Sequence, residues 1–376
     1  MEYKRLGDIA TYINGYPFKP EDRGTTGLPI IRIQDLTGNA YDTGFYDGDY
    51  PERIEINDGD VLISWSASLG IYIWNKGKAL LNQHIFKVAF DKCAVNKQYF
   101  VYAVQHKLQE MEAKTHGATM KHIVKKDFDN TVIPFPAFEE QEKISQIMNH
   151  ASGIISARQQ ELQKLDELVK ARFVEMFGDV IHNDRQWPQR LFSEVASSRL
   201  GKMLDAKQQT GKHSYPYLAN FNVQWFQFAL DTLNQMDFDE KDQVEFALQE
   251  GDLLVCEGGE IGRCAVWHNE IQPCYFQKAL HRVRCNKSVI LPDYLAWWFK
   301  YNCECGGFSA IEGAKATIAH LPGAKLKQLQ VVVPPRSLQE QFATFIKQTD
   351  KSKVVVQKAL DEAQTLFDSL MQQYFG

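Results

Sequence analysis

The feature that most constrains the fold of this chain is a stretch of about forty residues, 138–178, that has the pattern of one long helix. It follows the segment Ile133–Pro136, whose two prolines favour extended backbone, and it contains no proline. Apolar residues recur at helical spacing and charged residues fill the other faces. The apolar stripe consists of Ile144, Ile147, Met148, Ala151, Ile154, Ile155, Leu162, Leu165, Leu168, Val169, Phe173 and Phe177. Such a helix is about 60 Å long, which is typical of a rod that spaces other parts of a protein.

The rod pattern occurs a second time, at the end of the sequence. Leu338–Gly376 also follows a proline stop, and its Leu338–Gln341 matches Phe138–Gln141. Its apolar residues from Val356 onward step by four and three, as in a coiled-coil seam. Because one such helix has too little apolar surface to be stable alone, we expect the two to pack antiparallel, in a coiled-coil-like pair.

The sequence before each rod is repeated as well. The matching positions are Leu6–Ala10 with Phe192–Ala196, Gly15 with Gly201, Gly59-Asp60 with Gly251-Asp252, Gln83 with Gln277, and Gly117 with Gly313. The chain is therefore predicted to hold two similar globular modules with an internal two-fold repeat. The predicted segments are a first module at 1–138, a first long helix at 139–178, a second module at 179–337 and a second long helix at 338–376.

Within each module, short β-branched and aromatic runs between Gly, Asp and Asn residues predict strands. A helix is expected over 96–114 in the first module and over 292–302 in the second, where Pro292 suits a first helical turn. The fold class predicted for both modules is α/β to α+β.

Charge and cysteine content limit the classes of function. The net charge over 376 residues is −5, and none of the four segments is net positive. This argues against a high-affinity nucleic-acid binder that acts alone, but not against one that takes positive charge from partners. The seven cysteines suggest no disulfide framework and favour a reducing cytoplasm. There is no apolar run long enough for a membrane span, and the charged start predicts no signal peptide.

Catalytic motifs are missing from the sequence. The phosphate-binding G-x-x-x-x-G-K-[ST] loop, H-E-x-x-H, G-x-S-x-G and the Asn/Asp-Pro-Pro-aromatic element of adenine methyltransferases do not occur. Glu112 and Lys114 have the spacing of half a nuclease site, but a solvated helix face explains them better. We therefore expect no catalytic residue, metal or cofactor in this chain.

Polar and aromatic residues gather beside the glycine turns of both modules. Arg, Lys, Asn, Gln and Glu side chains read base edges, and Lys, Ser and Thr hold phosphates. The candidate DNA-binding residues of the first module are Tyr16, Lys19, Arg32, Ser66, Ser68, Lys76, Asn82, Gln83, His84, Thr119, Lys121 and His122. Those of the second module are Lys202, Lys207, Asn222, Glu257, Arg263, Gln277, Lys278, His281, Lys315, Thr317 and His320. The frame agrees between the copies whereas these residues differ, as two modules reading two different targets require.

With its doubled module and rod, the chain resembles the specificity subunit of a type I restriction–modification system. The resemblance is carried by Leu6–Ile9, by the two Gly-Asp turns, and by the helix starts Pro136–Gln141 and Pro335–Gln341. It implies two target-recognition domains, each reading half of a bipartite site in double-stranded DNA, with the helices setting the spacer. It also implies two modification subunits, which dock on the helices and methylate adenine with S-adenosylmethionine, and restriction subunits, which use ATP and magnesium.

Three alternatives stay open at this stage. The chain could serve a related phage-defence or orphan methylation system without a restriction partner. It could be a coiled-coil scaffold that binds no nucleic acid. It could also be a nuclease, although that reading needs a carboxylate cluster that the sequence does not offer.

Overall fold

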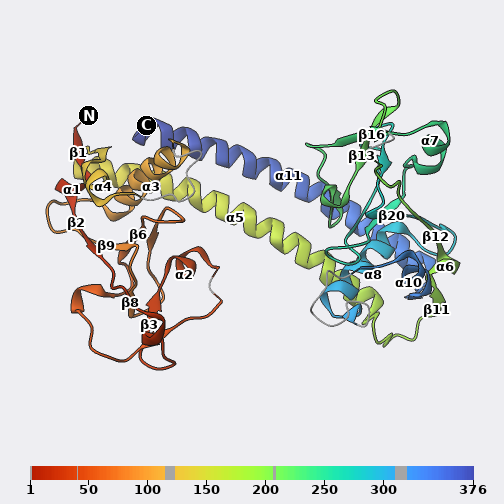
Figure 1. The fold of residues 1–376 in the computed structure, drawn as a ribbon, viewed down its shortest axis with the longest axis horizontal. Coiled ribbons are helices and arrows are strands. Elements are labelled where there is room, and N and C mark those ends of the chain that lie inside the picture. Colours follow the sequence, from red (N-terminus) through yellow and green to blue (C-terminus); the bar gives the residue numbers. More distant parts are fainter. Residues whose placement is uncertain (1, 40, 115–122, 206–208, 310–319) are drawn as a thin grey trace. The chain divides into compact units, whose positions relative to one another are not determined.

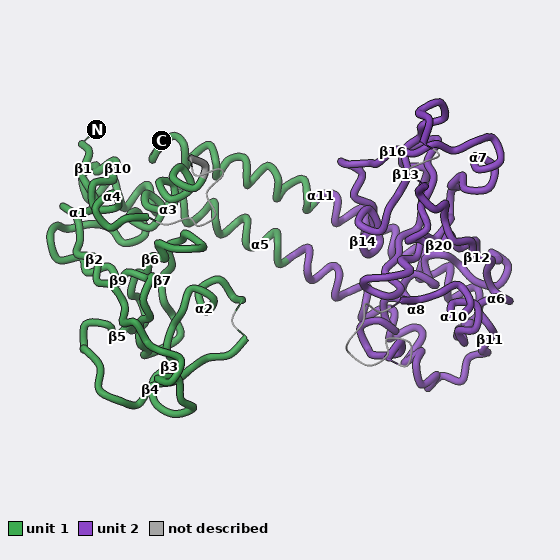
Figure 2. Tube along the Cα trace, in the orientation of Figure 1, with its two compact units in different colours: residues 1–160, 356–376 green, residues 161–355 purple. Residues whose placement is uncertain are grey.

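The computed structural model describes residues 2–39, 41–114, 123–205, 209–309 and 320–376. These residues form two compact units, one made of residues 1–160 and 356–376 and the other of residues 161–355 (Figure 2). None of the described helices combines the length and the apolar character that crossing a bilayer requires.

The first unit contains the first module and one half of each long helix (Figure 1). Its main sheet is antiparallel with the order β2-β9-β6-β7, and a second sheet has the order β4-β3-β8-β5, in which β3 and β8 run parallel. A two-stranded ribbon, β1-β10, precedes the first long helix. The elements are β1 (Tyr3–Arg5), α1 (Leu6–Ile9), β2 (Thr11–Asn14), β3 (Leu28–Ile31), α2 (Ile33–Thr37), β4 (Phe45–Tyr46), β5 (Glu55–Ile56), β6 (Val61–Ser64), β7 (Gly70–Ile73), β8 (Ala79–Leu81), β9 (Ile85–Ala89), α3 (Lys97–Lys114), α4 (Lys125–Asn130), β10 (Val132–Pro134) and α5 (Phe138–Phe177).

The second unit repeats this plan with the second module. Its main sheet has the order β12-β20-β17-β18, its second sheet the order β16-β13-β19 with β13 and β19 parallel, and its ribbon is β11-β21. The elements are β11 (Gln189–Leu191), α6 (Phe192–Val195), β12 (Ala196–Leu200), β13 (Ser214–Leu218), β14 (Val223–Gln224), β15 (Gln227–Phe228), β16 (Asn234–Asp237), α7 (Glu240–Phe246), β17 (Leu253–Cys256), β18 (Cys264–Val266), β19 (Tyr275–Phe276), β20 (Leu280–Cys285), α8 (Pro292–Glu304), α10 (Gly323–Gln328), β21 (Gln330–Val332) and α11 (Arg336–Phe375). The mixed helix-and-sheet class and the internal repeat predicted from the sequence are confirmed.

One inner strand of each main sheet, β6 or β17, is apolar except for Ser64 at the end of β6, and it is buried on both faces. In β6, Val61 and Ile63 lie in the core beneath α3, whereas Leu62 lies in the core of the second sheet. In β17, Leu253 lies in the core beneath α8 and Leu254 in the other core. Successive side chains of a strand point to opposite faces, so one unbroken apolar run supports two cores in each module.

The long helices α5 and α11 pair antiparallel, as predicted, and each contributes half of its length to each unit. In the first unit, Met148 of α5 shares a core with Met371 and Phe375 near the end of α11. In the second unit, the later residues of α5 share a core with Phe342 near the start of α11. An ion pair of 2.6 Å joins the Lys353 Nζ to the Asp166 Oδ1 in this second half. The direction of the pairing is therefore the same in both units.

The helix pair covers only part of the predicted apolar stripe. Val169 and Val356 are buried, and six other apolar residues of the two helices are half-buried, namely Ile155, Leu162, Leu165, Leu360, Phe367 and Leu370. Three residues predicted in the stripe are exposed instead: Ile147, Ile154 and Leu168. The reason is that one partner helix covers one side of a helix, whereas the stripe is wider than that side.

The equivalence between the two long helices also differs from the sequence match. The sequence paired Gln141 with Gln341, but α5 begins at Phe138 and α11 at Arg336, so Gln339 lies in the place equivalent to Gln141. Both residues bond to the carbonyl oxygen five positions earlier, Pro136 and Pro334 respectively. Glu- and Gln-rich stretches offer several similar alignments, and the hydrogen bonds decide among them.

Burial within the second unit leads to a stability prediction. Phe173 is completely buried and its ring lies 5.1 to 5.9 Å from those of Phe177, Phe342 and Tyr294. Phe173→Ala should lower the free energy of unfolding of this unit by about 3–5 kcal/mol, because the cavity cannot fully collapse. Leu162→Ala, at a half-buried position of the same helix, is the matched variant and should cost less than half as much. Chemical denaturation of both variants checks this, and equal losses would contradict the packing described.

Candidate nucleic-acid interface

In the first module, three chain segments carrying predicted contact residues meet at one place. The segment after β2 pairs with the β8–β9 connection, since the Tyr16 N–H donates to the Leu81 carbonyl at 2.8 Å and the Gln83 N–H to the Tyr16 carbonyl at 2.9 Å. The end of β6 joins them, because the Trp65 N–H donates to the His84 carbonyl at 3.2 Å. We call this meeting point the hub of the module.

The second module builds its hub with the same backbone bonds. The Lys202 N–H donates to the Phe276 carbonyl, the Lys278 N–H to the Lys202 carbonyl and the Glu257 N–H to the Ala279 carbonyl, at 3.1, 2.9 and 3.0 Å. The backbone frame is therefore shared while the side chains differ.

A glycine makes each hub possible. A Cβ at Gly15 would lie 2.0 Å from the Asn82 carbonyl oxygen, and one at Gly201 would lie 2.3 Å from that of Gln277. No side chain fits at such distances, so the close approach of the segments requires glycine at both positions. The repeated Gly15 and Gly201 of the sequence are explained by this crossing.

The hub bonds correct one pairing made from the sequence. Gln83 was matched with Gln277, but Tyr16 bridges to Asn82 and Lys202 bridges to Gln277. Asn82 is thus the equivalent of Gln277, and Gln83 the equivalent of Lys278. Gln83 and Gln277 are the same residue type but lie one position apart in the two frames. Backbone hydrogen bonds, and not residue identity, show the register.

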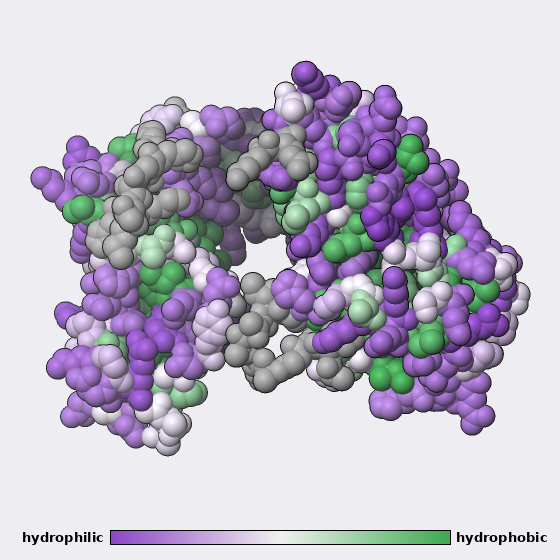
Figure 3. All heavy atoms as spheres, turned by 45° about the vertical axis from the view of Figure 1, so that its right-hand side comes forward, coloured by the Kyte–Doolittle hydropathy of each residue, from purple (hydrophilic) through white to green (hydrophobic). Residues whose placement is uncertain are grey.

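The predicted contact residues differ in how accessible they are. Tyr16, Lys19, Ser68, Lys76, Gln83, Lys278 and His320 are exposed. Arg32, His84, Lys202, Glu257, Arg263 and Gln277 are half-buried, and Ser66, Asn82, Asn222 and His281 are buried. Thr119, Lys121, His122, Lys207, Lys315 and Thr317 lie outside the described residues. The surface seen in Figure 3 is mostly hydrophilic, with apolar residues in small groups.

Two of the buried residues do not fit the prediction of direct DNA contact. The Asn222 side chain, with no exposed surface, accepts from the Ala219 N–H at 2.9 Å and donates to the Ala229 and Thr232 carbonyls. The His281 ring is hydrogen-bonded to the Leu321 carbonyl at 2.8 Å, and burial lowers its pKa. Both hold loops in place, because a buried polar group needs its partners inside the protein.

Two of the basic candidates, Arg32 and Arg263, already lie beside carboxylates of the chain. The Arg32 guanidinium lies 3.2 Å from a carboxylate oxygen of Asp42, and that of Arg263 lies 3.7 Å from Glu260. Their positive charge is partly balanced within the protein, in keeping with the absence of a basic surplus.

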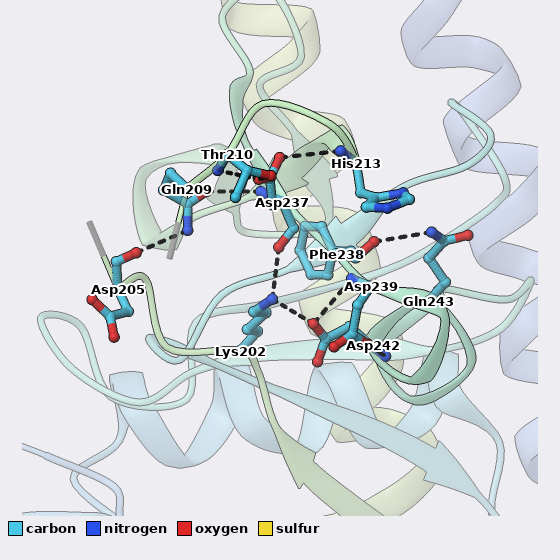
Figure 4. Close-up of polar contacts among 10 residues, drawn as sticks. All are labelled: Lys202, Asp205, Gln209, Thr210, His213, Asp237, Phe238, Asp239, Asp242 and Gln243. Carbon is cyan, nitrogen blue, oxygen red and sulfur yellow. Dashed lines mark hydrogen bonds and ion pairs between the residues drawn. The ribbon is translucent and has the colours of Figure 1, made fainter. Parts of the chain in front are cut away.

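Lys202 belongs to a polar network that the sequence did not predict (Figure 4). Its Nζ donates to the Asp237 carbonyl at 2.6 Å and pairs with the Asp242 carboxylate. The Asp237 carboxylate accepts from the Thr210 hydroxyl at 2.7 Å and from the Gly211 N–H at 2.8 Å. The hydrogen bond from the Thr210 hydroxyl lowers the pKa of the Asp237 carboxyl. The network anchors the segment that leaves the hub, so Lys202 has a positioning role in this structure.

Sequence reasoning also missed exposed apolar residues near the second hub. Met203, Leu204 and Phe221 are about half exposed or more. The Lys278 Nζ lies 3.9 Å from the Met203 sulfur. Single apolar residues in a polar segment can lie in a core or on the surface, and the sequence pattern did not distinguish these two cases. Apolar side chains at a DNA surface can contact thymine methyl groups.

Comparison with known proteins gives the family. The model of the type I restriction modification DNA specificity domain matches residues 1–167 and 185–363. The chain is 27% identical over 168 residues to the type I restriction enzyme EcoBI specificity subunit of Escherichia coli, a match that covers 44% of this chain and 35% of that protein. It is 23% identical to the MjaVIII specificity subunit of Methanocaldococcus jannaschii, over 56% of this chain and 50% of that one. These matches span half or less of the relatives' own length.

Longer matches extend over nearly the whole chain. The EcoKI specificity subunit of Escherichia coli K12 is 21% identical over 98% of this chain and 86% of its own. The solved S subunit of a type I restriction-modification system from M. genitalium shares the fold with a TM-score of 0.56 at 13% identity, covering 100% and 96% of the two chains. A chain from a structural study of complex assembly and conformational transition of the type I R-M system gives 0.60 at 14% identity, covering 99% and 97%. With its doubled module, its paired long helices and a family match over both halves, the chain belongs to the type I restriction modification DNA specificity family.

Proposed function

We propose that this chain is the DNA-recognition subunit of a type I restriction–modification complex, in which each module reads one half of a bipartite site. The observation that carries the proposal is the repeated hub. Its backbone frame is the same in both modules, while Tyr16, Asn82 and Gln83 in one correspond to Lys202, Gln277 and Lys278 in the other. A constant frame with different side chains suits two modules that read different sequences.

The exposed hub residues differ in the bases they suit. A glutamine amide can form two hydrogen bonds to adenine, and a lysine ammonium donates to the acceptors of guanine. Gln83 and Lys278 occupy equivalent exposed places, so they are the proposed base readers of the two modules. Tyr16, Lys19, Ser68, Lys76 and His320 are the proposed surrounding contacts to the DNA.

The partners would dock on the long helices. Each unit exposes apolar side chains there: Ile147, Ile154 and Leu366 in the first, and Leu168, Val354 and Val355 in the second. One exposed set per unit suits two modification subunits, which would supply S-adenosylmethionine-dependent adenine methylation and positive charge for the DNA phosphates. Restriction subunits would use ATP and magnesium, and we expect this chain to be no enzyme itself.

The cysteines suit a reducing cytoplasm. Cys93, Cys256, Cys264, Cys274, Cys285 and Cys305 are free thiols, and burial raises the pKa of Cys256 to about 11. A thiol in that state is a poor nucleophile, which fits a structural role in such a compartment.

The test is methylation sequencing of DNA from a host that expresses the chain with its modification subunit. Adenine methylation at one bipartite sequence is the expected result. Lys278→Ala should relax one position of one half-site, a discrimination of about 1–3 kcal/mol, and Gln83→Ala should do the same in the other half. Lys351→Ala, an exposed change on α11, is the control.

Two other results would point to the alternatives. No methylation and no DNA retention with the modification subunit present would favour a scaffold. Methylation without restriction of incoming unmethylated phage DNA in the native host would favour an orphan methylation system.

A further inference from the structure

Each long helix carries a buried glutamine in its first turn. Gln141 of α5 is 1% exposed and Gln339 of α11 is 0% exposed. Burying an amide is unfavourable unless its hydrogen bonds are made inside the protein. The partners of these two side chains therefore show what the glutamines do.

Gln141 joins three segments of the first unit. Its Oε1 accepts from the Asn96 N–H at 3.0 Å, and its Nε2 donates to the Pro136 carbonyl at 2.9 Å. Asn96 directly precedes α3 and caps it, since its side-chain oxygen accepts from the Tyr99 N–H. Pro136 lies between β10 and α5. The amide thus ties the start of the long helix to the start of the helix that covers the main sheet.

Gln339 makes the same connections in the second unit. Its Oε1 accepts from the Leu291 N–H at 2.8 Å, and its Nε2 donates to the Pro334 carbonyl at 2.9 Å and to the Val289 carbonyl at 3.1 Å. Leu291 is the N-cap residue of α8. The same joint is therefore built twice, once for each module.

A tyrosine of the module helix supports each joint. The Tyr99 hydroxyl donates to the Pro134 carbonyl and the Tyr294 hydroxyl to the Val332 carbonyl, both at 2.9 Å. Both tyrosines are completely buried. The connection between ribbon and long helix is thus held by directional bonds from two sides.

The hydrogen bonds of the joint do more than hold the module and the long helix together. Apolar burial is non-directional, and the cores beneath α3 and α8 already hold module and helix together. Hydrogen bonds restrict angle as well as distance. A glutamine with its donor and acceptor both engaged at this point fixes the direction in which the module leaves the helix.

We propose that Gln141 and Gln339 are positioning residues that hold each module at one angle to its long helix and so restrict the number of base pairs between the half-sites. The inference rests on the proposed function. Neither residue touches DNA in this account; each acts through the orientation of its module.

The experiment uses the full chain with its modification subunit and a set of DNA duplexes. Each duplex carries the parent's two half-sites, with spacers from two base pairs shorter to two longer than the parent's. The measured quantity is the ratio of methylation at the parent spacer to methylation at the neighbouring spacers. Gln141→Leu should lower this ratio by at least about tenfold, because it leaves the Asn96 N–H without its partner. The half-site sequences should stay the same.

The control is Gln163→Leu on the same helix. Gln163 is exposed, and its amide donates to the Glu167 carboxylate four residues on. It should keep the parent's spacer preference. Gln339→Leu should broaden the preference as Gln141→Leu does.

A second variant guards against misfolding. Gln141→Glu keeps the size and the acceptor for the Asn96 N–H but, when ionised, cannot donate to the Pro136 carbonyl. It should also broaden the spacer preference. An unchanged preference in both Gln141 variants, or an equal loss at every spacer, would overturn the inference. If the parent complex methylated no bipartite site at all, the proposed function itself would fail.

Discussion

Exchanging residues 1–138 for the corresponding module of another family member should replace one half of the methylated site and leave the other half unchanged. The second module has its own sheets, cores and hub, none of which uses a residue from 1–138 among the described residues. Its side chains therefore have no reason to change their positions. Methylation sequencing of the parent and the exchanged chain measures both halves at once.

The structure adds a condition for this experiment. The core of the first unit includes Met371 and Phe375 of α11, and the rings of Tyr99 and Phe375 lie 5.2 Å apart. The donor module must offer an aromatic residue in the place of Tyr99, or the exchanged chain will lose stability for a reason unrelated to DNA. The reciprocal exchange of residues 179–337 is the control and should change only the other half. A simultaneous change of both halves would show that the modules do not read independently.

Lengthening both long helices by four residues should add about two unread base pairs to the site and keep both half-site sequences. Four residues extend an α-helix by about 6 Å, and successive base pairs of B-DNA are about 3.4 Å apart. The insertions belong after Gln160 and after Val355, where the division between the two units crosses α5 and α11. Inserting at both places keeps the antiparallel partners in register.

A variant of unchanged length is the control for the insertion. Replacing the exposed residues 159, 160, 163 and 164 with alanine alters the same region without lengthening it, and it should keep the parent's spacer. Genome-wide mapping of methylated adenines compares the three chains. A fully active insertion variant with the parent's spacer would mean that the helices do not measure the gap.

The sequence by itself determined the plan of this protein. Proline stops and helical periodicity place the long helices within two residues of their observed bounds. Apolar residues at helical spacing over forty positions fit no other regular secondary structure. Glycines at matching places, such as Gly15 and Gly201, indicated the repeat before any contact was known. The polar residues beside the glycine turns predicted a recognition surface at the hubs. This prediction needed only neighbouring residues in the chain, so it could be made without the fold.

Only the tertiary structure decided which residues are equivalent and which are accessible. Asn82 rather than Gln83 corresponds to Gln277, and Gln339 rather than Gln341 corresponds to Gln141, because backbone hydrogen bonds set the register and similar letters do not. Asn222 and His281 are residue types that commonly contact DNA, yet both are buried. The Asn222 amide bonds to carbonyls 7 and 10 residues on, and the His281 ring to the carbonyl of Leu321, 40 residues on. The division of α5 and α11 between two units has the same origin. Burial depends on what packs against a residue, and the order of residues in the chain does not show which segments meet.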